Sequence, residues 1–292
     1  MKSYKFQHAA PDTIEEVVHV LKSHPGEVKI ISGGQSLMPV LNFRLAKPDL
    51  LLDLKNLKHL TTIKISDDET ELGARVRWVD IEKNVELTDV QPLLQKALSY
   101  VAHYQIRNRG TVGGSLANSD PAAELPLLAL VLDAKIKVVG SNGNREIEIG
   151  DYFKGFMSTS LAKDEVIVAL VLPKWPATRR WGFQEFSRRH GDFAMAACAL
   201  WFDLSSSKEM QNIHLGVIGA NDYPVRLGAL ERFLENKIFS VDLLDEAIDL
   251  GLKDIQPPVD PQISQAYRLS LISTMIKRSF EQSFERFKHL ES

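Results

Sequence analysis

Two glycine-rich segments hold the residues of this sequence with the clearest capacity for chemistry. The first is Ser32-Gly33-Gly34-Gln35-Ser36, and the second is residues 110–115 (GTVGGS). Paired glycines accept positive φ and have no Cβ, so a ligand can approach the backbone closely. Successive N–H groups in such turns can converge on a phosphate oxygen, and neighbouring hydroxyls add donors without charge. Two segments about eighty residues apart could therefore hold the two halves of one dinucleotide.

The alternatives for these segments are a plain turn, a Rossmann site and a P-loop. Isolated glycine pairs mostly form turns, but polar residues at 105–109 (QIRNR) and 118–124 (NSDPAAE) surround the second segment. Asp53 lies 20 residues after Gly33, the offset of a ribose-binding acid. However, GGQSLM is not G-x-G-x-x-G, and Pro39 leaves little room for a crossover helix. Neither segment ends in the Gly-Lys-Ser/Thr of a P-loop.

Composition narrows the class of protein. The 292 residues are 44% hydrophobic and 25% charged, which is typical of a globular chain of about two domains. A formal charge of −3 is not that of a nucleic-acid-binding protein. The single cysteine, Cys198, cannot form an intramolecular disulfide or supply the four ligands of an iron–sulfur cluster. No apolar stretch is long enough to span a bilayer, the first residues do not resemble a secretory signal, and we expect a cytoplasmic location.

Hydrophobic periodicity predicts the elements that position these segments. Thr13 and Glu16 have the spacing of a capping box, which predicts a helix from residue 14 to about 23. A buried strand at 28–31 leads into the first glycine segment. The other elements expected in the first half are strands at 50–54, 62–65, 71–74, 136–139, 145–149 and 166–172, and helices at 91–102 and 122–132.

The sequence Pro173-Lys174-Trp175-Pro176 predicts a domain boundary, because proline denies a backbone donor and favours extended backbone before it. We expect a first domain at 1–176, with subdomains of about 1–56 and 57–176, and a second at 177–292. The second would be α+β, with antiparallel strands at 182–186, 194–202 and 213–219, then helices at 227–235, 241–252 and 263–287. Cys198 falls in an apolar run and is expected in the core.

Three segments resemble a known family. Residues 31–39 (ISGGQSLMP) with 42–46 (NFRLA), and residues 105–126 (QIRNRGTVGGSLANSDPAAELP), are similar to the two flavin motifs of the FAD-binding medium subunit of molybdenum hydroxylases. Residues 188–194 (RRHGDFA) are similar to the segment that opens the family's C-terminal domain. The family includes flavoprotein subunits of xanthine dehydrogenase, aerobic carbon monoxide dehydrogenase and nicotine dehydrogenase. The resemblance implies an α+β fold: a PCMH/vanillyl-alcohol-oxidase-type FAD-binding domain of two α/β subdomains, plus a C-terminal domain.

The resemblance also implies which residues contact FAD. They are Lys29, Ile30, Ile31, Ser32, Gly33, Gly34, Gln35, Ser36 and Leu37 of the first motif, Thr111, Val112, Gly113, Gly114 and Ser115 of the second, and Glu124, Ile167 and Gln184. Glu124 stands where the family usually has an aspartate near the ribityl or ribose, and Ser115 replaces a frequent asparagine. Ile167 aligns with an apolar residue against the isoalloxazine. Gln184 aligns with a lysine of the eukaryotic xanthine enzyme, so acceptor behaviour is not carried over. No catalytic residue and no metal ligand is expected in this chain.

The function implied by the resemblance is electron transfer. A molybdenum cofactor on a large partner subunit would oxidise the substrate, and two-iron two-sulfur clusters on a small partner would pass electrons to this chain's FAD and on to an external acceptor. We expect a heterotrimer, assembled as a dimer of heterotrimers, with the cationic segments 105–109 and 188–192 facing a partner or acceptor. Two alternatives are a self-contained FAD-dependent oxidase or dehydrogenase of the same cofactor fold, and an FAD-bearing assembly factor. The substrate cannot be deduced from this chain, because a partner subunit would select it.

Overall fold

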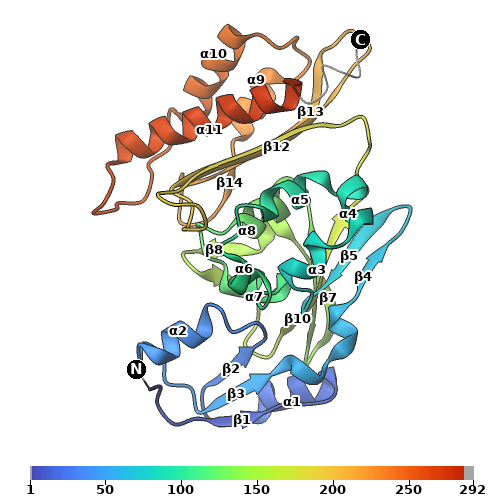
Figure 1. Cartoon of the computed structure of the whole chain (residues 1–292), viewed down its shortest axis with the longest axis vertical. Coiled ribbons are helices and arrows are strands. Elements are labelled where there is room, and N and C mark those ends of the chain that lie inside the picture. The colour runs from blue at the N-terminus through green and yellow to red at the C-terminus, as the bar shows by residue number, and fades with distance from the viewer. Residues whose placement is uncertain (1, 286–292) are drawn as a thin grey trace.

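Three parts of the chain follow one another along the long axis of the molecule (Figure 1). The computed structural model describes residues 2–285. The N-terminal part is a three-stranded parallel sheet in the order β1-β3-β2. Its elements are β1 (Gln7–Ala9), α1 (Ile14–Ser23), β2 (Val28–Ile31), α2 (Leu37–Asn42), β3 (Leu50–Asp53) and two short 3₁₀ turns, Leu54–Asn56 and Lys58–Thr61.

The predicted start of α1 is confirmed. Thr13 Oγ1 accepts a hydrogen bond from Glu16 N at 3.2 Å, while Glu16 Oε2 accepts from Asp12 N, one residue before the cap. Two expectations for the region that follows were wrong. Strand β2 is only half-buried, because it pairs with β3 alone and lies at the edge of the sheet. There is also room for a short crossover helix, α2, because Pro39 lies in its first turn, where a missing N–H is tolerated.

The middle part is a five-stranded antiparallel sheet in the order β4-β5-β10-β6-β7, with helices packed on one face. Its strands are β4 (Ile63–Ile65), β5 (Glu69–Gly73), β6 (Lys135–Gly140), β7 (Gly143–Glu148) and β10 (Val166–Pro173), with a 3₁₀ turn at Ile149–Asp151 and a small hairpin, β8 (Phe153–Gly155) and β9 (Ser158–Thr159). Its helices are α3 (Trp78–Glu82), α4 (Val85–Val90), α5 (Pro92–Leu98), α6 (Tyr104–Arg107), α7 (Val112–Asn118) and α8 (Glu124–Val131). The helix expected at 91–102 ends early, at Leu98, and Ala102 has a positive φ.

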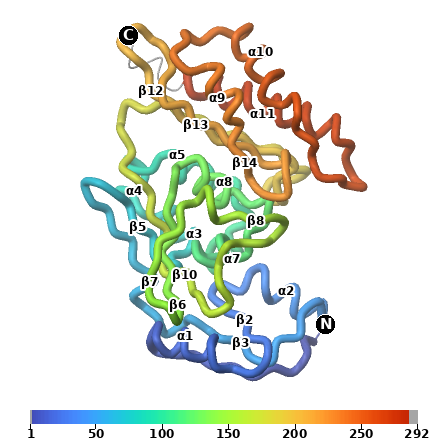
Figure 2. The backbone as a smooth tube through the Cα atoms, turned by 180° about the vertical axis from the view of Figure 1, so that it is seen from behind, coloured from blue at the N-terminus to red at the C-terminus, as the bar shows by residue number. Residues whose placement is uncertain are grey.

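The C-terminal part is an antiparallel sheet covered by helices, as predicted, with one more strand than expected. The strands β11 (Arg180–Phe186), β12 (Ala196–Leu204), β13 (Met210–Ile218) and β14 (Val225–Arg226) lie in sequence order. The helices are α9 (Gly228–Leu234), α10 (Val241–Leu252) and α11 (Gln265–Glu285). The last two residues of the helix expected at 263–287 lie outside the described part. Figure 2 shows α10 and α11 at the far end of the molecule from β1 and β3.

The C-terminal sheet contributes to two hydrophobic cores. Cys198 is fully buried in the core beneath α11, as expected. The opposite face of the sheet, including Trp181 and Phe183, belongs to the core of the middle part. The packing therefore continues across the linker at 173–176. The division of the chain into domains 1–176 and 177–292 therefore stays a prediction, because residues from both sides of the linker share one hydrophobic core.

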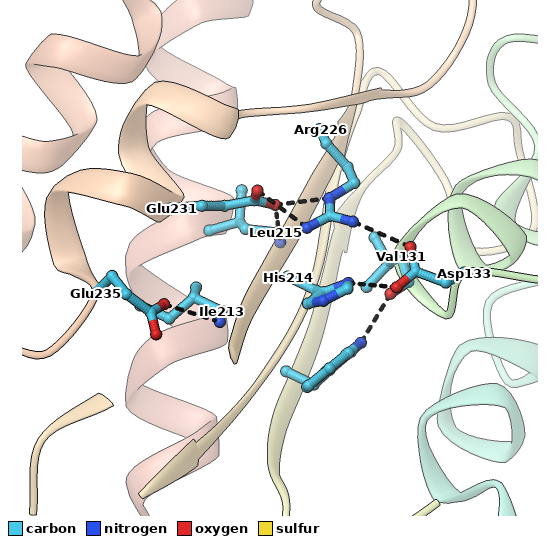
Figure 3. Close-up of polar contacts among 9 residues, drawn as sticks. Val131, Asp133, Ile213, His214, Leu215, Arg226, Glu231 and Glu235 are labelled. Atoms are coloured by element: carbon cyan, nitrogen blue, oxygen red, sulfur yellow. Dashed lines mark hydrogen bonds and ion pairs between the residues drawn. The ribbon is translucent and has the colours of Figure 1, made fainter. Parts of the chain in front are cut away.

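Polar contacts also join the middle part to the C-terminal sheet, across an interface that we call the seam (Figure 3). Asp133, just after α8, lies 3.2 Å from His214 Nδ1 and 3.0 Å from Arg226 Nη1, both on the C-terminal sheet. The indole of Trp201 stacks on the His214 ring with centroids 3.9 Å apart, and Trp201 Nε1 donates to Val131 O at 2.7 Å. Burial lowers the pKa of His214 to about 3, and Arg226 adds to this effect. The imidazole is therefore neutral at pH 7.

Candidate cofactor site

The first glycine segment is a turn between β2 and α2. Gly34 has φ of +73°, a conformation that favours glycine. A Cβ on Gly33 would lie 2.9 Å from the carbonyl carbon of Arg109 and closer still to its oxygen. Gln35 Nε2 donates to Gly33 O at 3.1 Å and braces the turn. Position 33 therefore needs glycine, because the backbone of the second segment leaves no space for a Cβ.

The second glycine segment is not an irregular turn, as the sequence suggested, but the first turn of α7. Thr111 is the N-cap, and its Oγ1 accepts a hydrogen bond from Gly114 N at 3.2 Å. A Cβ on Gly113 would lie 2.6 Å from Ala74 Cβ, so this glycine lets the helix pack on the sheet. We had expected Gly113 to leave room for a ligand, but Ala74 occupies that space. Gly114 is exposed, and Ser115 beside it is half-buried.

The two glycine segments, which were expected to hold one ligand between them, are in direct contact. Thr111 Oγ1 donates to Ser32 Oγ at 3.2 Å, across 79 residues of chain. The Gly33–Arg109 contact is the second point at which the segments touch. The second segment is in turn fixed to the sheet, because Gly113 N donates to Ala74 O at 2.8 Å and Ala74 N to Val168 O at 2.9 Å. This junction holds two Cβ-free backbone segments and several hydroxyls in one place.

The remaining residues of the first motif surround this junction. In the described residues β2 has a strand partner on one side only, so half of the backbone groups of Lys29, Ile30 and Ile31 face outward from the sheet. The exposed Ser36 forms no cap hydrogen bond to α2 within the described chain, and half-buried Leu37 begins the helix. These backbone and hydroxyl groups are available to a ligand.

Glu124 is a buried acid in the first turn of α8, only 8% exposed. Burial and, to a smaller extent, the nearby charge of Asp120 together raise its pKa to about 7. A carboxylate with little access to water needs a hydrogen-bonding partner. A cofactor hydroxyl at this position would provide one.

The last two predicted contacts differ in how well they fit. Ile167 is buried on the face of β10 that joins the core under the helices of the middle part. Gln184 pairs in register with Cys198, which belongs to the core beneath α11. Because side chains alternate along a strand, Gln184 points to that core and away from the middle part. The structure therefore does not support Gln184 as a cofactor contact.

Sequence reasoning missed its neighbour, Glu185. This side chain shares the face of Phe183, which belongs to the core of the middle part. Its Oε2 is buried and has no hydrogen-bond partner among the described residues. Burial raises the pKa of Glu185 to about 9, and the charge of Glu124 contributes. The signal in the sequence was an acid at a position that alternates with the aromatic residues Trp181 and Phe183 along the strand.

The two cationic segments near the flavin motifs also lie together. A Cβ on Gly191 would be 2.5 Å from His103 Cε1, so the loop after β11 packs on the residues just before α6. Arg188, Arg189 and His190 are exposed, and the same loop carries Phe193 with 66% of its surface open.

Residues 2–285 contain no group of three or more His, Cys, Asp or Glu side chains placed to hold a metal ion. Within the same residues, every helix is too short or too polar to cross a membrane.

Comparison with known proteins identifies the family of the chain. The family described as FAD binding domain in molybdopterin dehydrogenase matches residues 4–175, which include both glycine segments. The chain belongs to this family. The CO dehydrogenase flavoprotein C-terminal domain matches residues 181–283 of the same flavoprotein.

Relatives of this flavoprotein align over nearly the whole chain. The nicotine 6-hydroxylase medium subunit of Paenarthrobacter nicotinovorans is 35% identical, covering 98% of this chain and 100% of the relative. The caffeine dehydrogenase subunit beta of a Pseudomonas species is 30% identical, and the match covers 100% of this chain and 99% of the relative. Among solved structures, carbon monoxide dehydrogenase of Hydrogenophaga pseudoflava superposes with a TM-score of 0.94 at 28% identity, covering 98% and 99%. The predicted fold class and the assignment to the oxidoreductase flavoproteins of this family are therefore confirmed.

Proposed function

We propose that this flavoprotein is the electron-transfer subunit of a heterotrimeric molybdenum hydroxylase. It would take electrons from iron–sulfur clusters of a small subunit, after oxidation of the substrate at a molybdenum centre of a large subunit. The bound FAD would accept those electrons and pass them to an external acceptor. The observation that carries the proposal is the contact of the two glycine segments through Thr111, Ser32 and Gly33.

The residues around that contact fit FAD. Backbone of Ser32 to Leu37 and of Thr111 to Ser115 would hold the pyrophosphate, since Gly34 and exposed Gly114 leave the backbone open there. The hydroxyls of Ser36 and Ser115 would add donors. The outer edge of β2, at Lys29 to Ile31, would bind neighbouring parts of the cofactor.

The other residues would orient the cofactor. Glu124 would accept a hydrogen bond from a sugar or ribityl hydroxyl, in addition to the one from its own backbone. Ile167 would present an apolar surface and exclude water from the ring. In this account the protein binds, orients and tunes the cofactor and does not itself perform chemistry on the substrate.

Partner subunits are part of the proposal because the chain cannot hold the other redox centres. One cysteine, fully buried, cannot supply the ligands of a cluster. The relatives are named as medium chains or as subunits of complexes, which supports the same division of labour. The loop at 188–193 and the segment at 103–109 offer exposed cations and an exposed aromatic side chain for such a contact. Assembly as a dimer of heterotrimers and a cytoplasmic location are further proposals.

Purification from the native host tests the subunit assignment. A tag on this chain should recover a large and a small partner, with molybdenum, iron and FAD in the same peak and a mass near that of two heterotrimers. Substrate should then reduce the flavin in the complex, whereas dithionite but no organic substrate should reduce the flavin in the isolated chain. A lone flavoprotein that turns over an organic substrate without molybdenum or iron would instead establish the self-contained oxidase or dehydrogenase.

A further inference from the structure

Helix α8 runs along the C-terminal sheet in a register that can be followed residue by residue. Its last residue, Val131, receives the hydrogen bond of Trp201 Nε1 at 2.7 Å. Gly216 lies against both Val131 and Leu127, one turn earlier, because a Cβ on that glycine would lie 2.6 Å from Val131 Cγ2 and 2.9 Å from Leu127 Cδ1. Gly216 pairs with Ala199, two residues before Trp201 on β12. Going back along α8 from Val131 to Leu127 therefore corresponds to going from Trp201 to Ala199, towards the start of β12.

This alignment of α8 with β12 places Glu124 and Glu185 at the same height along the interface between the helix and the sheet. One further turn of α8 leads from Leu127 to Glu124, a rise of about 4.5 Å. The matching position on β12 is close to Ala197, and the residue paired with Ala197 across the sheet is Glu185. Glu185 lies on the face that packs against the middle part. The first turn of α8 and the end of β11 thus bring Glu124 and Glu185 towards each other.

The surroundings of the pair do not neutralise two negative charges. Glu124 is 8% exposed, and Glu185 Oε2 is buried without a hydrogen-bond partner in the described chain. The other titratable groups that act on the pair are Asp120, before α8, and Tyr100, after α5. Both of these groups are acids and bring no positive charge to the pair. The ammonium of Lys96 lies over the Tyr100 ring, 5.1 Å from its centroid. Strand β12 contributes Ala197, which has no charge.

We propose that Glu124 and Glu185 together hold one proton in the folded protein at neutral pH, and that Glu185 is thereby a positioning residue for Glu124. A neutral Glu185 leaves Glu124 free to accept a hydrogen bond from FAD. Loss of the shared proton would place two like charges across the seam between α8 and the C-terminal sheet. The role of Glu124 towards FAD rests on the proposed function, whereas the shared proton does not.

The direction of the effect follows from the raised pKa values of the pair. Burial, and the charge of Glu124, raise the pKa of Glu185 to about 9, far above that of an unfolded glutamate. The folded state therefore retains a proton that the unfolded state has released. Stability from this proton is present at low pH and is lost as the pH rises towards 9. One proton corresponds to a change of up to about tenfold in the unfolding equilibrium constant per pH unit.

The first measurement is urea unfolding of the cofactor-free full chain between pH 7 and pH 9. The unfolding constant of the parent should rise by several-fold to about tenfold per pH unit, whereas Glu185→Gln should be nearly flat and more stable at pH 9. Glu281→Gln, at an exposed position of α11, should follow the parent. Glu124→Gln should make the profile less steep without flattening it, because it removes the second charge while burial still raises the pKa of Glu185, and it serves if Glu185→Gln does not fold. Equal pH profiles for the parent and the folded pair variants would overturn the inference.

The second measurement is FAD affinity of the same proteins over the same pH range. The dissociation constant of the parent should rise several-fold towards pH 9, and that of Glu185→Gln should not. If FAD does not bind at any pH while the unfolding profiles differ as expected, the proposed function fails and the proton pair stands. If FAD binds but the parent and Glu185→Gln share one unfolding profile, the proton pair fails and the proposed function stands.

Discussion

Gly33→Ala tests the contact between the two glycine segments with the smallest possible change. The backbone at Gly33 does not have a positive φ, so alanine introduces no dihedral strain. Its Cβ would nevertheless lie 2.9 Å from the carbonyl carbon of Arg109, 3.0 Å from Gly110 Cα, and nearer still to the Arg109 oxygen. Ordinary contact begins at 3.4 Å, and the neighbours are backbone atoms that cannot rotate away. The segments must therefore separate.

We expect this separation to cost about 1–3 kcal/mol, the usual range for overpacking. It would also stretch the hydrogen bond from Thr111 Oγ1 to Ser32 Oγ, now 3.2 Å. If the whole cost falls on the FAD-binding arrangement, the dissociation constant should rise roughly 5- to 150-fold, since about 1.4 kcal/mol is a factor of ten.

The assay is titration of cofactor-free protein with FAD, followed by flavin fluorescence, together with urea unfolding. Gly150→Ala is the matched control, because a Cβ at that position would have no described atom within 4 Å. The control should bind FAD like the parent. A folded Gly33→Ala protein with unchanged FAD affinity would refute the placement of the cofactor on this junction.

Four further changes test separate parts of the structure. Thr111→Val should lose about 1–2 kcal/mol of stability in urea, because it removes the cap on Gly114 N and the bond to Ser32, whereas Thr111→Ser should retain both; equal losses would contradict the capping role. Gly113→Val should yield little folded protein by circular dichroism, because its side chain would collide with Ala74; a well-folded variant lacking only FAD would point to direct occlusion instead. The pKa of His214 is lowered to about 3, so the stability that this residue contributes when neutral is present above pH 6.5 and is lost as the pH falls. Between pH 7 and pH 5 the parent should therefore lose about 1–2 kcal/mol more stability than His214→Gln. Urea unfolding curves that shift in parallel for the two proteins would contradict this. Limited proteolysis should cut at exposed residues 176–178, and the fragments should co-elute because Trp181 and Phe183 belong to the core of the middle part; fragments that separate without denaturant would contradict a shared core.

The parts of the fold with strong local signals were predictable. Thr13 and Glu16 define the start of α1, and a continuous apolar run defines β12. The residue types of the two glycine segments suggested one shared ligand, whereas their direct contact through Thr111 and Ser32 is seen only in the structure. By contrast, β2 was expected to be buried, because a short apolar run does not show whether its strand is central or at an edge.

The errors at the site arose where long-range packing decides a residue's role. Gly113 and Gly114 are adjacent and identical in sequence, yet one packs on Ala74 and the other is exposed. Gln184 and Glu185 differ by one position on a strand, and only the register with Cys198 and Ala197 shows which of them faces the middle part. The resemblance pointed to Gln184, whereas Glu185 is the member of that pair that faces the middle part. A single sequence does not contain the tertiary register that distinguishes such neighbours.

The most direct test of the central claim is the flavin content of the purified full-length chain. Denaturation and chromatography of the released cofactor should give about one FAD per chain, or should do so after incubation with FAD, as expected for a subunit that binds and tunes one cofactor. The same analysis of folded Gly33→Ala should give clearly less. A folded parent chain that carries no flavin and takes up none from added FAD would contradict the account.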